Sequence, residues 1–435
     1  MILADFAPGL AVIGLLFVLL LARLPIAFAL AGAGLVGLAW ARPWRAVEYL
    51  LSTFAYSATA NYAYIVLPLF LFMGHMAFSA GLSRQAFEAG QTWLGRIPGG
   101  LAAATVFGCA AFSTICGSSV ATASTMARVA LPEMLRQRYA PRLAAGCVAA
   151  GGTLGVLIPP SGILVVYSIV TQVSLVDLFV AAFVPGVLTA VVYVAGIYAW
   201  ARLRPEVAPR DAALAAPGWG ERIGSLARAW ELLILFAAVM GTIYLGIATP
   251  TEAAALGALF SLMAVLRRRG WKRNVAEGLR ETGTATCSIF ALIIGAGLFS
   301  LGLSTTQLPA MLAAAVTGME LSQTATVLIV LVPYLILGCF VDGVSMILIT
   351  MPIVFPIVTG VGFDGVLFGL LVTKMVEIGA ITPPVGLNAF VVKSMAPEVE
   401  LKDIFAGCAP FVLMELAIVG LLIAAPGIAL FAVAR

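Results

Sequence analysis

The same helix-breaking phrase occurs twice in this chain, as GVLIPPSG at residues 155–162 and as GAITPPVG at residues 379–386. A helix cannot continue through either proline pair, because proline lacks a backbone N–H and its ring obstructs the preceding turn. Both breaks lie in segments otherwise apolar enough to span a bilayer, where an unpaired backbone polar group is costly unless it lines a cavity or coordinates an ion. A single proline kink needs no function, but paired breaks predict a transporter's binding site.

The repeat extends beyond the breaks. Pro132 and Pro356 share the same offset of 224 residues, and the segment around Pro25 has a counterpart around Pro250. We therefore expect two homologous halves, residues 1–205 and 229–435, joined by a charged, proline-containing linker at 206–228. Composition agrees, because 62% of the residues are hydrophobic and only 10% are charged, which indicates a polytopic membrane protein rather than a soluble domain.

Each half contains a second kind of interruption. A small polar group lies in the middle of an apolar stretch, at Gly117-Ser118-Ser119 in residues 100–134 and at Asp342-Gly343 in residues 321–358. A polar tip flanked by apolar arms predicts a re-entrant helical hairpin, since the tip needs a protein or water lining. We name these stretches hairpin 1 and hairpin 2.

The remaining apolar segments predict five crossings per half. An odd number of crossings orients the halves oppositely, so the expected fold is an all-α polytopic membrane protein of two inverted-topology repeats, each with five transmembrane helices and one hairpin. The predicted spans are 8–22, 24–41, 64–80, 142–171 (broken) and 176–201, followed by 229–246, 248–266, 284–304, 364–395 (broken) and 403–432.

Basic residues support this topology, because Lys and Arg accumulate in cytoplasmic loops. Of the 24 Lys and Arg residues, the predicted topology places 19 on one side and three on the other, namely Arg42, Arg45 and Arg435, with Arg128 and Lys374 inside the membrane. Both termini are then expected to face the periplasm. The net charge of +4 gives no reason to expect a nucleic-acid partner.

Several motifs, in order along nearly the whole chain, resemble one family. GSSVATA, GGTLGVLIPPSG, GIATPTEAAALGA, DGVSMILITMPIVFP and EIGAITPPVGLNAFVV look like the large membrane (M) subunit of tripartite ATP-independent periplasmic (TRAP) transporters. The resemblance implies a bacterial inner-membrane symporter that imports small organic acids, such as C4-dicarboxylates or sialic acid, with sodium ions. It also implies two partners, a small membrane subunit (Q) and a periplasmic substrate-binding protein (P), and no organic cofactor.

Sodium is a hard cation that prefers oxygen ligands, which an unwound backbone supplies as carbonyls. The tip of hairpin 1 and the first break predict one sodium site, and the tip of hairpin 2 and the second break predict another. The candidate ligands are Ser118, Ser119, Gly155, Ile158 and Pro160 for the first site, and Asp342, Gly343, Gly379, Thr382 and Pro384 for the second.

The substrate is expected between the two tips, where helix N-termini favour an anion. Its candidate ligands are Ser118, Ser161, Asp342, Asn388 and Arg128. For the serines and Asn388 the alternative is helix packing or a hydrogen bond to a neighbouring helix. For Arg128 the alternative is a side chain that reaches the cytoplasmic surface.

For the other ionisable residues in apolar segments, the sequence leaves both a structural and a functional role open. Glu252 follows Thr249 as in a helix cap, and Lys374 and Glu377 stand three residues apart on one helix face. We expect the lone His75 to donate a hydrogen bond to a neighbouring helix. The six cysteines have no metal-ligand spacing and predict no disulfide framework.

Two other classes of function are alternatives to this transporter. An intramembrane enzyme would need a nucleophile with a base or a metal cluster, and one histidine with no paired acidic motif in a span argues against it. A stand-alone ion-coupled organic anion symporter or antiporter would share the hairpins and breaks, so only the family-like motifs disfavour it. No P-loop is present, so a gradient is expected to drive transport, by an elevator movement of the hairpins and broken helices past the earlier spans.

Overall fold

The computed structural model describes residues 2–209 and 218–433, and over these residues the fold is helical throughout, which confirms the all-α prediction. Residues 210–217 of the predicted linker, and the end residues 1, 434 and 435, lie outside the described part. The helices of the first half are α1 Ile2–Leu21, α2 Ile26–Ala41, α3 Trp44–Thr59, α4 Val66–Ser79, α5 Leu82–Leu94, α6 Gly100–Cys116, α7 Ser119–Val129, α8 Leu131–Arg136, α9 Pro141–Leu157, α10 Gly162–Thr171 and α11 Leu175–Leu203.

The second half begins with α12 Trp219–Arg228, within the predicted linker, and α13 Trp230–Phe236, which continues through a π-helical turn at Ala237–Gly241 into α14 Thr242–Tyr244. The further helices are α15 Pro250–Leu266, α16 Trp271–Thr305, α17 Leu308–Gly318, α18 Gln323–Gly338, α19 Gly343–Gly360, α20 Gly365–Ala380, α21 Leu387–Met395, α22 Leu401–Ala424 and α23 Gly427–Leu430.

Both proline pairs interrupt helices. The first separates α9 from α10, which are bent by 41° relative to each other, and the second separates α20 from α21. In each predicted hairpin, two helices run back along one another: Gly108 of α6 lies against the Met126 side chain of α7, and the Tyr334 hydroxyl of α18 donates to Thr350 Oγ1 of α19 (2.6 Å). The structure contains no membrane, so re-entrance and the number of crossings stay predictions.

By length and apolarity alone, five helices of the described part are able to cross a bilayer, or up to seven if each of two bent pairs counts as one span. The five are Tyr62–Ser79, in which a 3₁₀ turn at Tyr62–Ile65 leads into α4, and the helices Leu175–Leu203, Trp271–Thr305, Gly343–Gly360 and Leu401–Ala424. Several predicted spans are shorter helices here, among them α2 and α15. A helix of about 20 residues spans a typical hydrocarbon core, so the short ones need tilting or a thinner bilayer to cross.

The structure also contains helices that apolar runs did not predict. Helices α3 and α5 are amphipathic, with Val47 buried and Tyr49 and Tyr56 exposed on α3, and Leu82 and Phe87 buried on α5. A search for continuous apolar windows misses such helices, because their apolar face is a stripe and their mean polarity is high. In the second half α16 is a single helix of 35 residues, longer than the predicted span 284–304.

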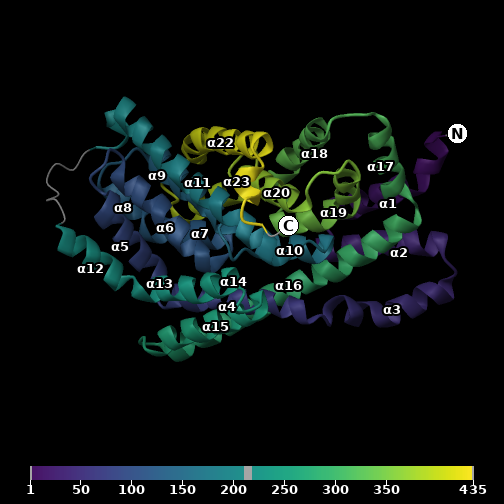
Figure 1. Cartoon of the computed structure of the whole chain (residues 1–435), viewed down its shortest axis with the longest axis horizontal. Helices are drawn as coiled ribbons and strands as arrows, with labels where there is room; N and C mark the ends of the chain where they lie inside the picture. The colour runs from purple at the N-terminus through teal and green to yellow at the C-terminus, as the bar shows by residue number, and fades with distance from the viewer. Residues whose placement is uncertain (1, 210–217, 434–435) are drawn as a thin grey trace.

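Helix packing brings the two halves together around the breaks. Helix α9 packs against α6, α7 and α22, and α18 packs against α20. Across the halves, α10 packs against α19 of hairpin 2, and α21 packs against α7 of hairpin 1. Figure 1 shows α10 beside α19 near the middle of the molecule, with the long α16 passing below them and α3 along the outer edge. Each broken helix therefore contacts the hairpin of the other half.

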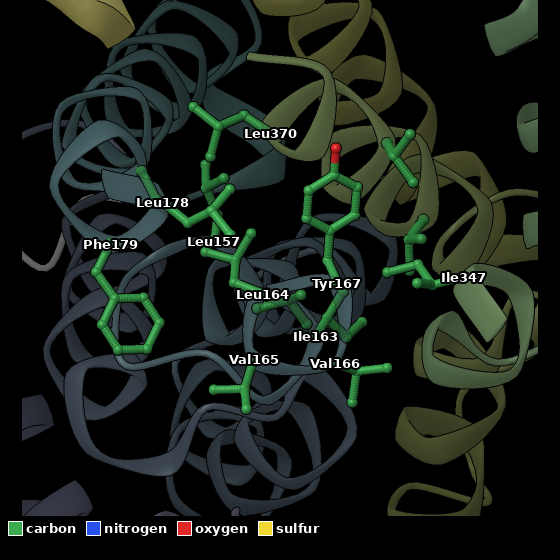
Figure 2. Close-up of a cluster of buried hydrophobic side chains, with 14 of the residues drawn as sticks. Leu157, Ile163, Leu164, Val165, Val166, Tyr167, Leu178, Phe179, Ile347 and Leu370 are labelled. Carbon is green, nitrogen blue, oxygen red and sulfur yellow. The ribbon is translucent and has the colours of Figure 1, made fainter. Parts of the chain in front are cut away.

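A buried apolar cluster surrounds α10. Figure 2 shows Tyr167 among these side chains, with Leu157 and Leu370 on one side and Ile347 on the other. The Tyr167 hydroxyl donates to the carbonyl of Gly365 at the start of α20 (2.7 Å), which satisfies a polar group that burial would otherwise penalise. The cluster fixes the segment after the first break against hairpin 2 and α20.

Candidate functional site

The tip of hairpin 1 lies directly on the first break. Gly117 has a left-handed φ of 61°, which turns the chain between α6 and α7, and its carbonyl accepts a hydrogen bond from the Gly162 N–H (3.3 Å). A Cβ atom on Gly155 would lie 2.6 Å from the Ser118 carbonyl oxygen. Only glycine fits such a close approach, so the sequence GSS at the tip and GVLIPPSG at the break are complementary in shape.

Hairpin 2 makes the corresponding contact with α20. A Cβ atom on Gly379 would lie 2.3 Å from the carbonyl carbon of Gly338, so the last turns of α18 and α20 meet backbone to backbone. Gly343, at the tip, approaches Ile163 just after the first break and Val376 of α20. The tip of hairpin 2 therefore touches elements of both halves.

A cavity of about 210 Å³ lies between the two tips. The first turns of α7, α10 and α19 border it, through Ser119, Gly162 and Gly343. Each helix N-terminus carries unpaired N–H groups and roughly half a positive charge, which favours an anion. The further lining residues come from hairpin 1, the broken helices, hairpin 2 and the spans α4 and α16: Leu67, Phe70, Leu71, Cys116, Gly117, Ser118, Val120, Val156, Ile163, Val165, Ile289, Gly338, Val341, Asp342, Val344, Val376, Ala380 and Leu387.

Asp342 is the one charged residue in this lining. It forms the N-cap of α19, with Oδ1 accepting from the N–H groups of Val344 and Ser345 (both 3.1 Å). Its other oxygen, Oδ2, takes no hydrogen bond from the described residues. A carboxylate with one capped oxygen and one free oxygen at a cavity is suited to meet a cation.

Two oxygens converge where hairpin 1 meets the first break. The Thr122 hydroxyl is fully buried beside the Cys116 thiol, and its Oγ1 and the Ser118 carbonyl oxygen lie 2.7 and 2.6 Å from the position of a Cβ on Gly155. A buried hydroxyl beside a carbonyl oxygen offers the kind of oxygen ligand that a sodium ion prefers, and the first sodium site stays a prediction. Thr122 was not predicted, although it stands one helical turn after Ser118.

The other predicted ligands lie outside the cavity lining. Ser161 is fully buried as the N-cap of α10, with its Oγ accepting from the Leu164 N–H (3.3 Å). Ile158 is buried against Gly186 of α11, and Pro160 lies over Gly117. The Thr382 hydroxyl donates to the Ile378 carbonyl (2.5 Å).

Asn388 and Pro384 differ in their surroundings. Asn388 is fully buried on α21, and its Nδ2 donates to the Ala149 carbonyl of α9 (3.2 Å), as its packing interpretation requires. Its Oδ1 has no hydrogen-bond partner among the described residues. Pro384 is exposed.

The Lys374–Glu377 pair belongs to a larger buried network. Lys374 Nζ donates to Glu415 Oε2 and Thr189 Oγ1 (both 2.7 Å) and lies 3.4 Å from Glu377 Oε2, and the Tyr193 hydroxyl donates to Glu415 Oε1 (2.5 Å). These side chains join α20 to α11 and α22 without solvent exposure. Sequence reasoning missed Glu415, although a lone carboxylate in the apolar segment LMELAI was a usable signal.

The remaining open residues have partners elsewhere. The Glu252 carboxylate accepts from the backbone N–H of Thr249, completing a capping box at the start of α15. His75 Nδ1 of α4 lies 2.8 Å from Glu281 Oε2 of α16, a contact between helices as predicted. Arg128 lies away from the cavity between the tips, in a separate cleft beside α5.

The chain matches one protein family over nearly its whole length. The model of the DctM component of tripartite ATP-independent periplasmic transporters matches residues 13–428. The large permease protein DctM of a C4-dicarboxylate TRAP transporter from Pseudomonas aeruginosa is 36% identical over 347 residues, covering 78% of this chain and 79% of that protein. The sialic acid TRAP transporter large permease SiaM of Vibrio cholerae is 29% identical, covering 80% and 81%.

Solved transporters share the fold at low sequence identity. The Alcanivorax borkumensis YdaH transporter superposes with a TM-score of 0.62 at 17% identity, covering 88% of this chain and 89% of its own. The relatives in sequence are transporter permeases rather than enzymes, and the apolar helices agree with a multi-pass protein of the inner membrane. From the family match, the relatives and the ordered motifs together, this chain belongs to the TRAP transporters as a large membrane (M) subunit.

Proposed function

We propose that this subunit forms the transport path of a sodium-coupled symporter that imports a small organic acid. The observation that supports this most is the cavity between the hairpin tips, where three helix N-termini and Asp342 meet. Among the described lining residues there is no Lys, Arg or His, so an anion would depend on helix N-termini, hydroxyl groups and bound cations. Sodium ions would supply positive charge beside Asp342 and the substrate.

Sodium would be held by oxygen atoms already in place. At the first site we propose Ser118, Ser119, Gly155, Ile158 and Pro160 as predicted, with the Thr122 hydroxyl added because it is buried close to the Ser118 carbonyl oxygen. At the second site we propose Asp342, Gly343, Gly379, Thr382 and Pro384. The substrate would contact Ser118 and Asp342 in the cavity, with Ser161 and Asn388 behind its walls.

Cavity size favours a small substrate. A volume of about 210 Å³ is below the roughly 300–1,000 Å³ of sites for drug-sized ligands. Relatives are named for C4-dicarboxylates, sialic acid, ectoine and isethionate. Within this range the cavity favours a C4-dicarboxylate or another small acid over a bulky sugar acid.

The proposal includes partners, orientation and movement. A small Q subunit and a periplasmic P protein would complete the tripartite system, and the excess of basic residues on one side would place both termini in the periplasm. The two halves would be inverted repeats. The hairpins and broken helices would move as one body past α4 and α16, which border the cavity without contributing a break.

Proteoliposome uptake tests the coupling and Asp342 together. With the Q subunit and loaded P protein present, an imposed sodium gradient should drive uptake, and a proton gradient without sodium should not. Asp342→Ala should abolish uptake while co-purification with the Q subunit persists, and Asp364→Ala, which removes the N-cap carboxylate of α20, is the matched control. Uptake driven equally by protons alone would refute sodium coupling, and near-normal uptake by Asp342→Ala would refute its role.

A cysteine pair tests the movement. Leu71 of α4 and Val120 of α7 border the same cavity from the proposed static and moving bodies. In a background lacking reactive native cysteines, crosslinking Leu71→Cys to Val120→Cys should stop uptake, and reduction should restore it. Efficient crosslinking with unchanged turnover would contradict the elevator movement.

A further inference from the structure

A second cleft, of about 420 Å³, lies between α5 and the segment α7–α8. It is separate from the cavity between the hairpin tips, and the two share no lining residue. One wall comes from the polar face of α5 and the other from the end of the returning arm of hairpin 1. The lining residues are Arg84, Phe87, Glu88, Gln91, Arg128, Val129, Glu133 and Arg136.

The cleft has more positive than negative side chains. Three guanidinium groups face two carboxylates, and both carboxylates already have basic partners: Arg84 Nε lies 3.1 Å from Glu88 Oε1, and Arg136 Nη2 lies 2.7 Å from Glu133 Oε2. Arg128 forms no ion pair or hydrogen bond with the described residues. The cleft therefore presents one guanidinium group without an anion, flanked by two more.

Neighbouring side chains indicate the depth of the cleft. Helix α12 packs against α5, and the Arg222 guanidinium of α12 lies over the rings of both Trp93 of α5 and Trp219, 5.7 and 5.3 Å from their centroids. Tryptophan is enriched at the headgroup level of membranes, and exposed Trp219 and Ile223 give α12 an apolar face for that level. Within the cleft, Phe87 and Val129 supply apolar walls beside the arginines.

We propose that this cleft binds the phosphate group of an anionic phospholipid of the cytoplasmic leaflet, with Arg128 as its principal ligand and Arg84 and Arg136 at its sides. Guanidinium groups bind phosphate oxygens in bidentate geometry, and the apolar walls suit the beginning of an acyl chain. The leaflet assignment rests on the proposed orientation. Helix α7 begins with Ser119 at the transport cavity and has Arg128 in its last turn, so the bound headgroup would hold this arm of hairpin 1 against α5.

Native mass spectrometry of the detergent-purified protein tests the site, with dioleoyl-phosphatidylglycerol and dioleoyl-phosphatidylcholine as probes. The wild type should bind phosphatidylglycerol in preference. Arg128→Gln should weaken that binding about tenfold, the effect of one charge-assisted contact, and Arg128→Lys should restore part of it. Arg269→Gln removes the same charge from an exposed position outside the cleft and should leave binding unchanged.

Three results would overturn the proposal. One is equal binding of the two lipids by the wild type, and another is an equal loss in Arg128→Gln and Arg269→Gln. The third is an Arg128-dependent binding of succinate with phosphatidylglycerol binding unchanged, which would make the cleft a site for a released carboxylate substrate. Lipid binding in detergent depends on neither sodium coupling nor orientation, so its failure would leave the proposed function untouched.

Discussion

The two helix breaks share a sequence phrase but differ in their surroundings. At the first break every residue from Gly155 to Ser161 is buried, whereas at the second Pro383 and Pro384 are exposed. Four residues separate α9 from α10, and six separate α20 from α21. The tip of hairpin 1 contacts Gly155 and also the first break itself, at Pro160 and Gly162, whereas hairpin 2 meets the second broken helix at Gly379, before the proline pair.

The helices that lead into the breaks are anchored in different ways. Helix α9 is held by close contacts of small residues, with Gly146 against Gly407 and Gly152 against Ala123. Helix α20 has such a contact between Gly379 and Gly338, and it is held in addition by the buried charges of Lys374 and its partners. Duplicated sequence thus specifies where a helix breaks, while the neighbouring helices determine how enclosed each break is.

Cysteines placed at the two breaks should differ strongly in their rates of labelling. With exposed Cys287 replaced by serine, a membrane-impermeant maleimide should label Val385→Cys readily and Ile158→Cys hardly at all, because Ile158 is 3% exposed and Val385 is partly exposed. Mass spectrometry of the intact protein measures the rates, and denatured samples should label equally. Equal rates in the folded protein would show that the first break opens as freely as the second.

Removing the buried positive charge of Lys374 on α20 should strongly reduce the stability of the protein. Lys374→Met leaves the Glu415 and Glu377 carboxylates buried without a cation, and breaking a buried pair in this way costs about 3–5 kcal/mol. Thermal unfolding in detergent should show a large downward shift and a lower folded yield. The exposed Lys402→Met is the matched control and should change little.

A double variant tests whether the loss comes from uncompensated charge. Glu415→Gln in the Lys374→Met background removes one of the two stranded carboxylates, so part of the lost stability should return, with a coupling energy that a double-mutant cycle measures. If the double variant is as unstable as the sum of the single ones, the network does not act as a unit and α20 is anchored by apolar packing alone.

Sequence reasoning located the elements of this molecule better than their contacts. Proline pairs and polar tips inside apolar runs identify helix ends, because local chemistry determines them. The family resemblance, which the comparisons confirm, came from ordered motifs. Amphipathic α3 and α5 were missed because their apolar stripe is interrupted by polar residues, and α16 proved continuous across a region predicted as loop and span.

Contacts between distant segments were beyond the reach of sequence patterns. Lys374 pairs most closely with Glu415, 41 residues away, rather than with its helical neighbour Glu377. Ser161 resembles a ligand by its position after the proline pair, yet its hydroxyl caps α10. Arg128 lies near a predicted substrate site in sequence, but the returning arm of hairpin 1 places it in another cleft. In each case tertiary packing chose among partners that the sequence leaves equivalent.

Alanine substitutions at Gly155 and Gly379, where each broken helix meets a hairpin, should have the smallest effects and compare the two breaks most directly. A Cβ on Gly155 would meet the Ser118 carbonyl oxygen at 2.6 Å, and one on Gly379 would meet the Gly338 backbone at 2.3 Å. Overpacking costs about 1–3 kcal/mol. Gly155→Ala should lie at the upper end, since the buried first break cannot shift, and Gly379→Ala at the lower end, since the exposed prolines after it can move. Thermal unfolding in detergent measures both, with Gly420→Ala as the control because no neighbouring atom of the described residues lies within 4 Å of its Cβ position. Equal losses of stability in Gly379→Ala and Gly155→Ala would show that exposure does not make the second break easier to deform. The two breaks would then differ only in their exposure to solvent.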